Sequence, residues 1–144
     1  MILHCTKKLA ARLSDVSATP LVETCPLGSW HAHLLTYDRR QCVMFCHDAS
    51  RYILFLPGLV KSQFADLGRL HKDLFLASLS ALFVKQSLLS RIALAPGPMQ
   101  FDCKTDRSVL GTMRVTDIDL SWHLPDDLNV MDCDPVGEFR GQYI

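Results

Sequence analysis

Three short, mainly apolar segments follow one another in the first half of the chain. Residues 30–37, 42–48 and 51–56 are rich in aromatic and aliphatic side chains. Polar turns at 38–41 and 49–50 separate them, and Pro57 and Gly58 stop the third. Such runs, joined by short turns, are typical of β-strands that pair with their sequence neighbours. The pattern predicts an antiparallel meander of three strands.

A spacing of three and four residues marks the segment 62–84. The repeating apolar positions are Phe64, Leu67, Leu70, Leu74, Ala77 and Ala81. This spacing places them on one face of a helix, and Ser62 is a suitable N-cap. The residues expected to be buried against the sheet are Leu67, Leu74, Phe75 and Leu82.

The remaining elements are shorter. We expect a first strand at 1–6, helices at 7–14 and 87–94, and an edge strand at 99–103. A helix is expected from 105 through at least Met113, although residues 118–124 alternate as a strand would. The predicted fold is α+β, an antiparallel sheet of about four strands with helices packed on one face. One domain covers 1–124, and an acidic segment, 125–144, wraps the surface as a loop.

Composition places the chain among cytoplasmic globular proteins. Its 144 residues are 49% hydrophobic and 21% charged, which excludes intrinsic disorder. The first residues lack a secretory pattern, and the longest apolar run, 74–84, is too short for a membrane span. In that compartment the six cysteines should stay reduced, chiefly as small buried hydrophobic residues. They are Cys5, Cys25, Cys42, Cys46, Cys103 and Cys133.

The zero net charge conceals two oppositely charged parts. Residues 1–114 carry a net charge of +6 and residues 115–144 a net charge of −6. The basic part predicts a face for an anionic partner, either nucleic acid or an acidic protein, with the acidic segment as its competitor. The candidate anion-binding residues are Arg39, Arg40 and Arg51. The alternative is that the two parts attract each other and the arginines are solvated.

The first hairpin permits a prediction of which residues face each other. If Arg39 and Arg40 are its two central turn residues, one face of the sheet collects two histidines, a thiol and a carboxylate. This set is His31, His33, Cys46 and Asp48, with ligand types that suit zinc or another transition metal. Cys46 would lie opposite His33, which allows a Cys/His nucleophilic pair. The alternative is two partly exposed histidines beside a buried thiol.

Five blocks of the sequence together resemble a family of small bacterial proteins that carries only a domain-of-unknown-function label. The blocks lie at 1–9, 27–32, 38–42, 55–58 and 106–111, and they include MIL-x-CT-x-KL, LG-x-W and DRR. The resemblance extends over about residues 1–135. It implies a bacterial intracellular protein and brings no catalytic or ligand residue with it.

Three hypotheses for the function follow. The first is a non-enzymatic binding module with a basic face for an anionic partner, without cofactor or membrane contact. The second is a small metal-dependent or Cys/His hydrolase, a nuclease included, built on the hairpin face. The third is self-association into a homo-oligomer through an uncovered sheet face or edge.

Overall fold

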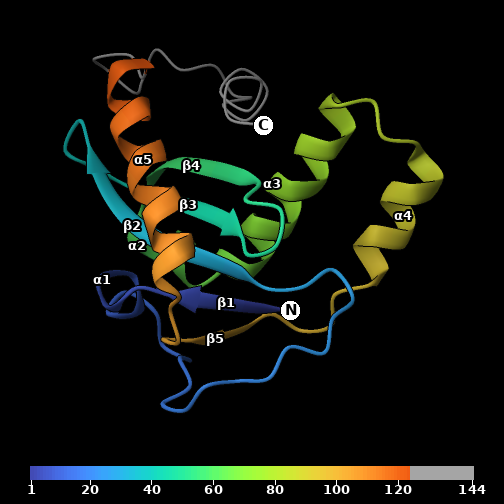
Figure 1. Ribbon diagram of the computed structural model, residues 1–144, viewed down its shortest axis with the longest axis horizontal. Helices are drawn as coiled ribbons and strands as arrows, with labels where there is room; N and C mark the ends of the chain where they lie inside the picture. Colours follow the sequence, from blue (N-terminus) through green and yellow to red (C-terminus); the bar gives the residue numbers. More distant parts are fainter. Residues whose placement is uncertain (124–144) are drawn as a thin grey trace.

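In the described part of the chain, the sheet has five strands that run in mixed directions. A computed structural model describes residues 1–123 of the chain (Figure 1). Its strands are β1 (Ile2–Cys5), β2 (Trp30–Tyr37), β3 (Arg40–His47), β4 (Ile53–Leu59) and β5 (Gln100–Asp102). Their order is β4-β3-β2-β1-β5. The antiparallel meander β2-β3-β4 is confirmed, but β1 runs parallel to both β2 and β5. The α+β class is therefore correct, whereas the expectation of about four antiparallel strands is not.

Within residues 1–123, five helices accompany the sheet. They are α1 (Lys7–Ala10), α2 (Lys61–Phe64), α3 (Leu67–Ala81), α4 (Gln86–Leu94) and α5 (Arg107–His123). The single helix expected at 62–84 is two helices, α2 and α3, and the second ends at Ala81. Leu82 is consequently exposed, contrary to expectation, while Leu67 and Leu74 are buried. The ambiguous segment after residue 105 is one continuous helix.

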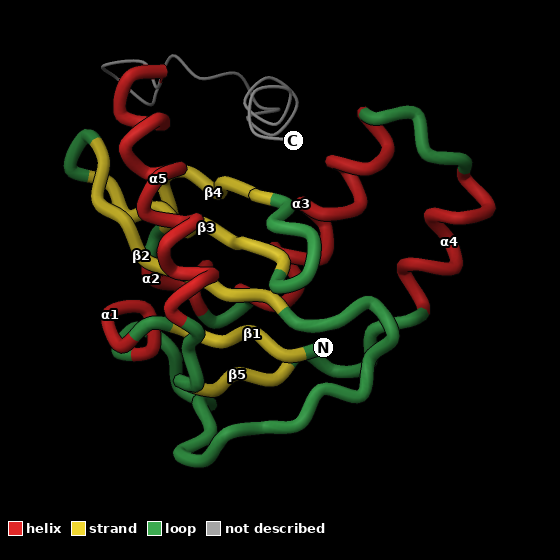
Figure 2. Tube along the Cα trace, in the orientation of Figure 1, coloured by secondary structure: helices red, strands yellow, loops and turns green. Residues whose placement is uncertain are grey.

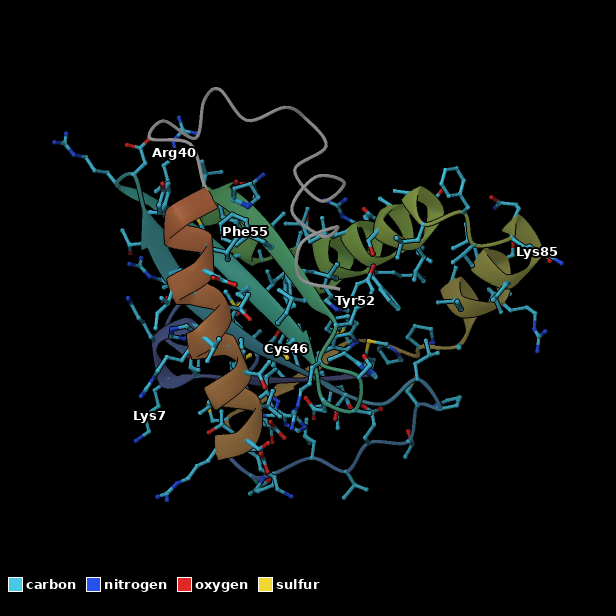
Figure 3. The ribbon with its side chains drawn as sticks, turned by 45° about the horizontal axis from the view of Figure 1, so that its top comes forward. Lys7, Arg40, Cys46, Tyr52, Phe55 and Lys85 are labelled. Carbon is cyan, nitrogen blue, oxygen red and sulfur yellow. The ribbon has the colours of Figure 1, made fainter. Side chains whose placement is uncertain are left out.

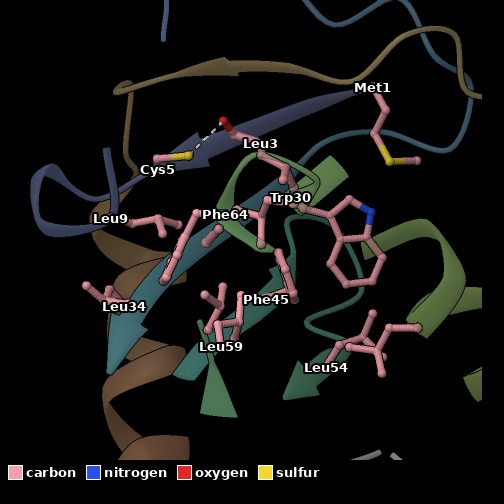
Figure 4. Close-up of a cluster of buried hydrophobic side chains, with 14 residues drawn as sticks. Met1, Leu3, Cys5, Leu9, Trp30, Leu34, Phe45, Leu54, Leu59 and Phe64 are labelled. Carbon is pink, nitrogen blue, oxygen red and sulfur yellow. Dashed lines mark hydrogen bonds between the residues drawn. The ribbon is translucent and has the colours of Figure 1, made fainter. Parts of the chain in front are cut away.

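One face of the sheet carries the larger core. Figure 4 shows alternate side chains of β2 and β3, among them Trp30, Leu34 and Phe45, in this core. They pack with Leu67 and Leu74 of α3. The first helix and α2 complete this cluster through their buried apolar side chains. This face of the sheet is the one that α3 covers, as the helical spacing of Leu67 and Leu74 predicted.

The second face is covered as well, by α5. Val109 and Met113 of α5 pack against Met44 and Cys46 of β3 and against Phe55 of β4. Figure 1 shows α5 in front of the sheet, with α3 on the far side. The expectation of helices on one face is wrong, because the side chains of β3 and β4 are apolar on both faces and need two covering layers.

The long segment between α1 and β2 lies along the open edge of β5. It runs as a loop in Figure 2. Val16 forms a parallel bridge with Phe101 of β5, and Ser17 N donates to the carbonyl of the same residue at 2.8 Å. The carboxylate of Glu23 accepts from Ile2 N at 2.7 Å. Loop residues therefore hold both β1 and β5 in place.

Within the described residues, no helix is long and apolar enough to cross a membrane. The predicted acidic segment 125–144 lies outside the described residues, so its competition for the basic part stays a prediction.

Candidate functional site

The first hairpin turns one residue earlier than predicted. Asp38 and Arg39, not Arg39 and Arg40, are the central residues, and both have positive φ, at 50° and 60°. This geometry is that of a type I′ turn, which matches the twist of a hairpin. The pairing shifts by two residues, so that His31 lies opposite Cys46 and His33 opposite Met44. A shift of two keeps each side chain on its predicted face, because strand side chains alternate with a period of two.

The structure brings together only part of the predicted metal set. His31 Nδ1 and Asp48 Oδ1 are 2.7 Å apart. His33 Nδ1 lies instead 2.8 Å from the hydroxyl of Thr6. Across residues 1–123, no three His, Cys, Asp or Glu side chains are grouped to hold a metal ion. The predicted four-residue metal set is therefore not assembled, because His33 points to β1 rather than to Asp48.

Cys46 does not form the predicted nucleophilic pair. It lies across from His31 rather than from His33, and it is fully buried beneath α5 (Figure 3). Burial raises the pKa of its thiol to about 11. A thiol with that pKa is protonated at neutral pH, whereas the nucleophile in cysteine catalysis is the thiolate. Cys46 and His33 therefore do not lie opposite each other, and the buried thiol stays protonated.

The three candidate arginines are divided between opposite ends of β3. Arg39 and Arg40 lie at the β2–β3 turn, and Arg51 lies beyond His47 in the β3–β4 turn. Figure 3 shows this separation, with Arg40 at one end and Tyr52 at the other. An eight-residue strand spans roughly 25 Å, so the three guanidinium groups do not form one anion site. Arg51 Nη2 instead donates to the hydroxyl of Ser108 at the start of α5, at 2.7 Å.

A chain of serine, histidine and aspartate lies on the α5 face of the sheet. Ser29 Oγ is 3.2 Å from His4 Nε2, and His4 Nδ1 is 2.6 Å from Asp102 Oδ1. Asp102 is fully buried, and its carboxylate also accepts from Leu21 N at 2.9 Å and from Lys104 N at 3.1 Å. A carboxylate that accepts several such bonds is fixed in place. His4 therefore donates from Nδ1, and its Nε2 faces the serine.

A second carboxylate reaches the same serine from the other side. The hydroxyl of Ser29 donates to Asp48 Oδ2 at 3.0 Å. His31 Nε2 accepts from Asp106 N at 2.8 Å, so its proton is on Nδ1, which donates to Asp48 Oδ1. Burial would raise the pKa of Asp48, but the hydrogen bonds from His31 and Ser29 outweigh it and lower the pKa. The proton of Ser29 thus has two acceptors within reach, Asp48 and His4.

Four segments of the chain supply this network. His4 is on β1, Asp102 ends β5, His31 is on β2, and Asp48 follows β3. Ser29 precedes β2 and follows Gly28, whose φ of 81° allows the loop to turn into the strand. Burial decreases along the network, from the fully buried Asp102 to Asp48, whose side chain is 29% exposed. The half-buried Ser29 is near the end that meets solvent.

Sequence reasoning identified His31 and Asp48 but missed His4, Ser29 and Asp102. His4 and Asp102 are 98 residues apart in the chain, and only the parallel pairing of β1 with β5 joins them. The one local signal was a histidine inside a short apolar strand, where an unpaired polar side chain would be costly.

The chain matches the family described as Domain of unknown function (DUF6933) over residues 2–138, and it belongs to that family. No curated protein shows significant similarity to the chain, and neither does any solved structure.

Proposed function

We propose that the protein is a serine hydrolase that acts on acyl esters through Ser29, His4 and Asp102. The supporting observation is the hydrogen-bonded order of these three groups, with distances of 3.2 and 2.6 Å. The buried acid orients the imidazole, the imidazole is within reach of a hydroxyl, and the hydroxyl is the most accessible of the three. This proposal refines the hydrolase hypothesis by replacing the metal ion or the cysteine with a serine.

The reaction runs in two halves. Ser29 Oγ attacks the acyl carbon, and its proton moves to His4 Nε2. The imidazolium, stabilised by Asp102, passes this proton to the leaving alcohol as the ester C–O bond breaks. Water then gives a proton to His4 and attacks the acyl group on Ser29. The acid is released, and the proton returns to the Ser29 oxygen.

Asp48 has a separate role in this scheme. It accepts the Ser29 hydroxyl in the resting arrangement, at 3.0 Å from Oδ2, and must release it before His4 accepts the proton. A carboxylate held by His31 therefore competes with the base for the nucleophile's hydrogen. In the proposed mechanism Asp48 is a positioning residue that sets the direction of the Ser29 hydroxyl.

Covalent labelling tests the proposal directly. A fluorophosphonate probe should label the wild-type protein at Ser29, as peptide mass spectrometry would show, and Ser29→Ala should not be labelled. The chain offers a matched control in Ser50, whose hydroxyl lies 2.8 Å from His47 Nδ1. His47 Nε2 is bound to the carbonyl of Leu27 rather than to a carboxylate. Ser50→Ala should therefore be labelled like the wild type.

The second measurement is the labelling rate of a variant at Asp102, the acid that orients His4. Asp102→Asn should lower the labelling rate by about a hundredfold or more, because an amide no longer stabilises the imidazolium. Absence of label on the wild type, or label on Ser50 instead of Ser29, would refute the serine mechanism. Hydrolysis of p-nitrophenyl acetate should follow the labelling: it should be lost in Ser29→Ala, reduced in Asp102→Asn and unchanged in Ser50→Ala.

A second candidate function, binding of an anionic partner, is favoured by a cavity beside α1 and α5. Its lining includes Thr6, His33 and Arg114. Burial lowers the pKa of His33, and the nearby positive charge of Lys8 lowers it further. Arg114 thus lines the cavity, and Lys8 adds a second positive charge near His33, although the carboxylate of Asp117 also lines the cavity.

Retention on single-stranded DNA at two salt concentrations tests this second candidate. The double variant Lys8→Ala/Arg114→Ala should lose retention at low salt, since each phosphate contact releases bound counterions. A matched double variant, Lys61→Ala/Arg91→Ala, removes two cations from helices α2 and α4 and should retain it. Equal retention of both double variants would contradict a role for this cavity.

A further inference from the structure

A cavity of about 220 Å³ lies between α3, α4 and the segment that leads into β5. Figure 1 shows α4 beside α3 and away from the sheet. Within residues 1–123, neither core cluster contains a residue of α4. Ile92 of α4 lines the cavity instead. The helix α4 thus adds a wall to this cavity rather than a further layer to the core.

The wall of the cavity is mainly apolar. The apolar side chains that line it include Met1, Phe75, Leu76, Ile92 and Met99. His71 lines it too, but both of its ring nitrogens are buried, so it presents no accessible polar atom. At Gly68 the walls meet closely, because a Cβ there would lie 2.8 Å from Met99 Cβ. A buried water molecule needs roughly two to four polar partners, so the interior favours an apolar occupant.

One cation at the cavity has no carboxylate partner. Arg69 and Lys72 both line the cavity. The guanidinium of Arg69 is paired with Asp66 and Asp73, each at 3.2 Å. Among the described residues, no carboxylate pairs with the half-buried Lys72. Such a lysine covers apolar surface with its methylene stem and keeps its ammonium group in water, so an anionic group at the edge of the cavity would find a partner.

The charges around the cavity favour an anion as well. Residues 66–101, which include α3 and α4, carry four basic and two acidic side chains. The two acidic ones are Asp66 and Asp73, which Arg69 already binds. The stretch 74–101 contains no acidic residue at all. A negative group beside the cavity would therefore meet more attraction than repulsion.

We propose that this cavity binds a single-chain fatty carboxylate, with its alkyl chain between α3 and α4 and its carboxylate at Lys72. A dry apolar cavity of about 150 Å³ accommodates benzene, which has six carbon atoms. In proportion, about 220 Å³ holds a chain of about nine carbon atoms. One apolar space and one unpaired lysine match one chain with one negative charge. The cavity is on the α3 side of the sheet and Ser29 is on the α5 side, so this proposal does not depend on the hydrolase.

A series of chain lengths tests whether the cavity holds the alkyl chain. Isothermal titration calorimetry at neutral pH should show decanoate binding to the wild-type protein. Decanoate should bind at least about tenfold more tightly than octanoate, because two more methylene groups leave water. Dodecanoate should bind within about threefold of decanoate, because its last carbons extend beyond the cavity. No binding of decanoate, or an affinity that rises as steeply from decanoate to dodecanoate, would overturn the proposal.

A change of charge tests the role of Lys72. Lys72→Gln should weaken decanoate binding by about threefold or more, as expected for the loss of a partly exposed ion pair. It should leave the affinity for 1-decanol, which has a similar chain without charge, within about twofold, and 1-decanol binding reports that the cavity is intact. The matched control is Lys85→Gln, since Lys85 precedes α4 and does not line the cavity. An unchanged ratio of the two affinities in Lys72→Gln, or an equal change in Lys85→Gln, would contradict the assignment of the carboxylate to Lys72.

A larger side chain tests the location of the site. Leu76→Trp should fill the cavity and abolish decanoate binding, whereas Leu82→Trp, at an exposed position just beyond α3, should bind like the wild type. If Leu76→Trp does not fold by circular dichroism, Ile92→Trp replaces it from the opposite wall. Sedimentation should show the same oligomeric state for the wild type and these variants. Decanoate binding that persists in the filled variant, or a wild-type dimer that this variant dissociates, would overturn the proposal, because the latter would mean that a second copy covers the cavity.

Discussion

His71→Phe should make the unliganded protein more stable. The substitution removes two buried nitrogens that have no hydrogen-bond partner among residues 1–123, and it keeps a flat ring between Trp30 and Phe45. Leaving a buried polar group unpaired costs about 1–3 kcal/mol, so the free energy of unfolding at pH 7 should rise by about that amount. His71 lines a cavity of about 220 Å³ between α3 and α4, which leaves space for the slightly larger phenyl ring. Urea denaturation followed by circular dichroism measures the change.

Acid should enlarge the difference between the two proteins. The pKa of His71 is lowered from 6.5 to about 3 in the folded state. Between these values the unfolded chain binds a proton that the folded protein does not, so stability falls as the pH falls. From pH 7 to pH 5 this linkage removes about 2 kcal/mol from the wild type and nothing from the variant. The figure depends almost entirely on the unfolded-state pKa.

The comparison between the proteins isolates His71, because every other titrating group is present in both. The reasoning would be refuted by equal losses of stability between pH 7 and pH 5. It would also be refuted if the free energy of unfolding of the variant at pH 7 were more than about 1 kcal/mol below that of the wild type, since the unpaired nitrogens would then not destabilise the folded protein. Coincident transitions by fluorescence and circular dichroism establish that the two-state analysis applies.

Three further predictions concern the core, a thiol and the network. Leu67→Ala should lower the free energy of unfolding by about 2–5 kcal/mol, and the exposed Leu82→Ala by less than about 0.5 kcal/mol, in urea denaturation. Iodoacetamide at pH 7 should alkylate the exposed Cys103 and spare Cys46, whose pKa burial raises to about 11; peptide mass spectrometry of the folded protein distinguishes them. Asp48→Asn should keep the fluorophosphonate label, because without the carboxylate the Ser29 hydroxyl is free to bond to His4. Loss of the label would mean that the reaction of Ser29 requires the Asp48 carboxylate.

The sequence determined the local elements and the face on which each strand residue lies. The strand at 30–37 has the predicted bounds, and the neighbouring segments pair antiparallel to it as expected. Leu67 and Leu74 of α3 are buried against the sheet, as their helical spacing indicated. These features follow from spacings of two and of three to four residues, which a short stretch of sequence displays completely.

The turn type of the hairpin was harder to predict. Asp38-Arg39 and Arg39-Arg40 are both polar, and no glycine marks the positions with positive φ. The resulting two-residue shift preserved the faces but changed every opposing pair. That is why His31 was correctly placed with Asp48, whereas His33 was wrongly added to the same set.

Only the tertiary structure decided that β1 lies between β2 and β5, that α5 covers the second face, and that Ser29, His4 and Asp102 meet. Parallel strands are not joined by a short turn that would identify which strands pair. The sequence near His4 therefore gives no indication that β1 pairs with β5 and brings Asp102 to His4. The same holds for His71, whose apolar surroundings come from the sheet, from α3 itself and from the segment before β5. Local spacing fixes the direction in which a side chain projects, whereas the residues that it meets depend on contacts between distant segments, which require the whole fold.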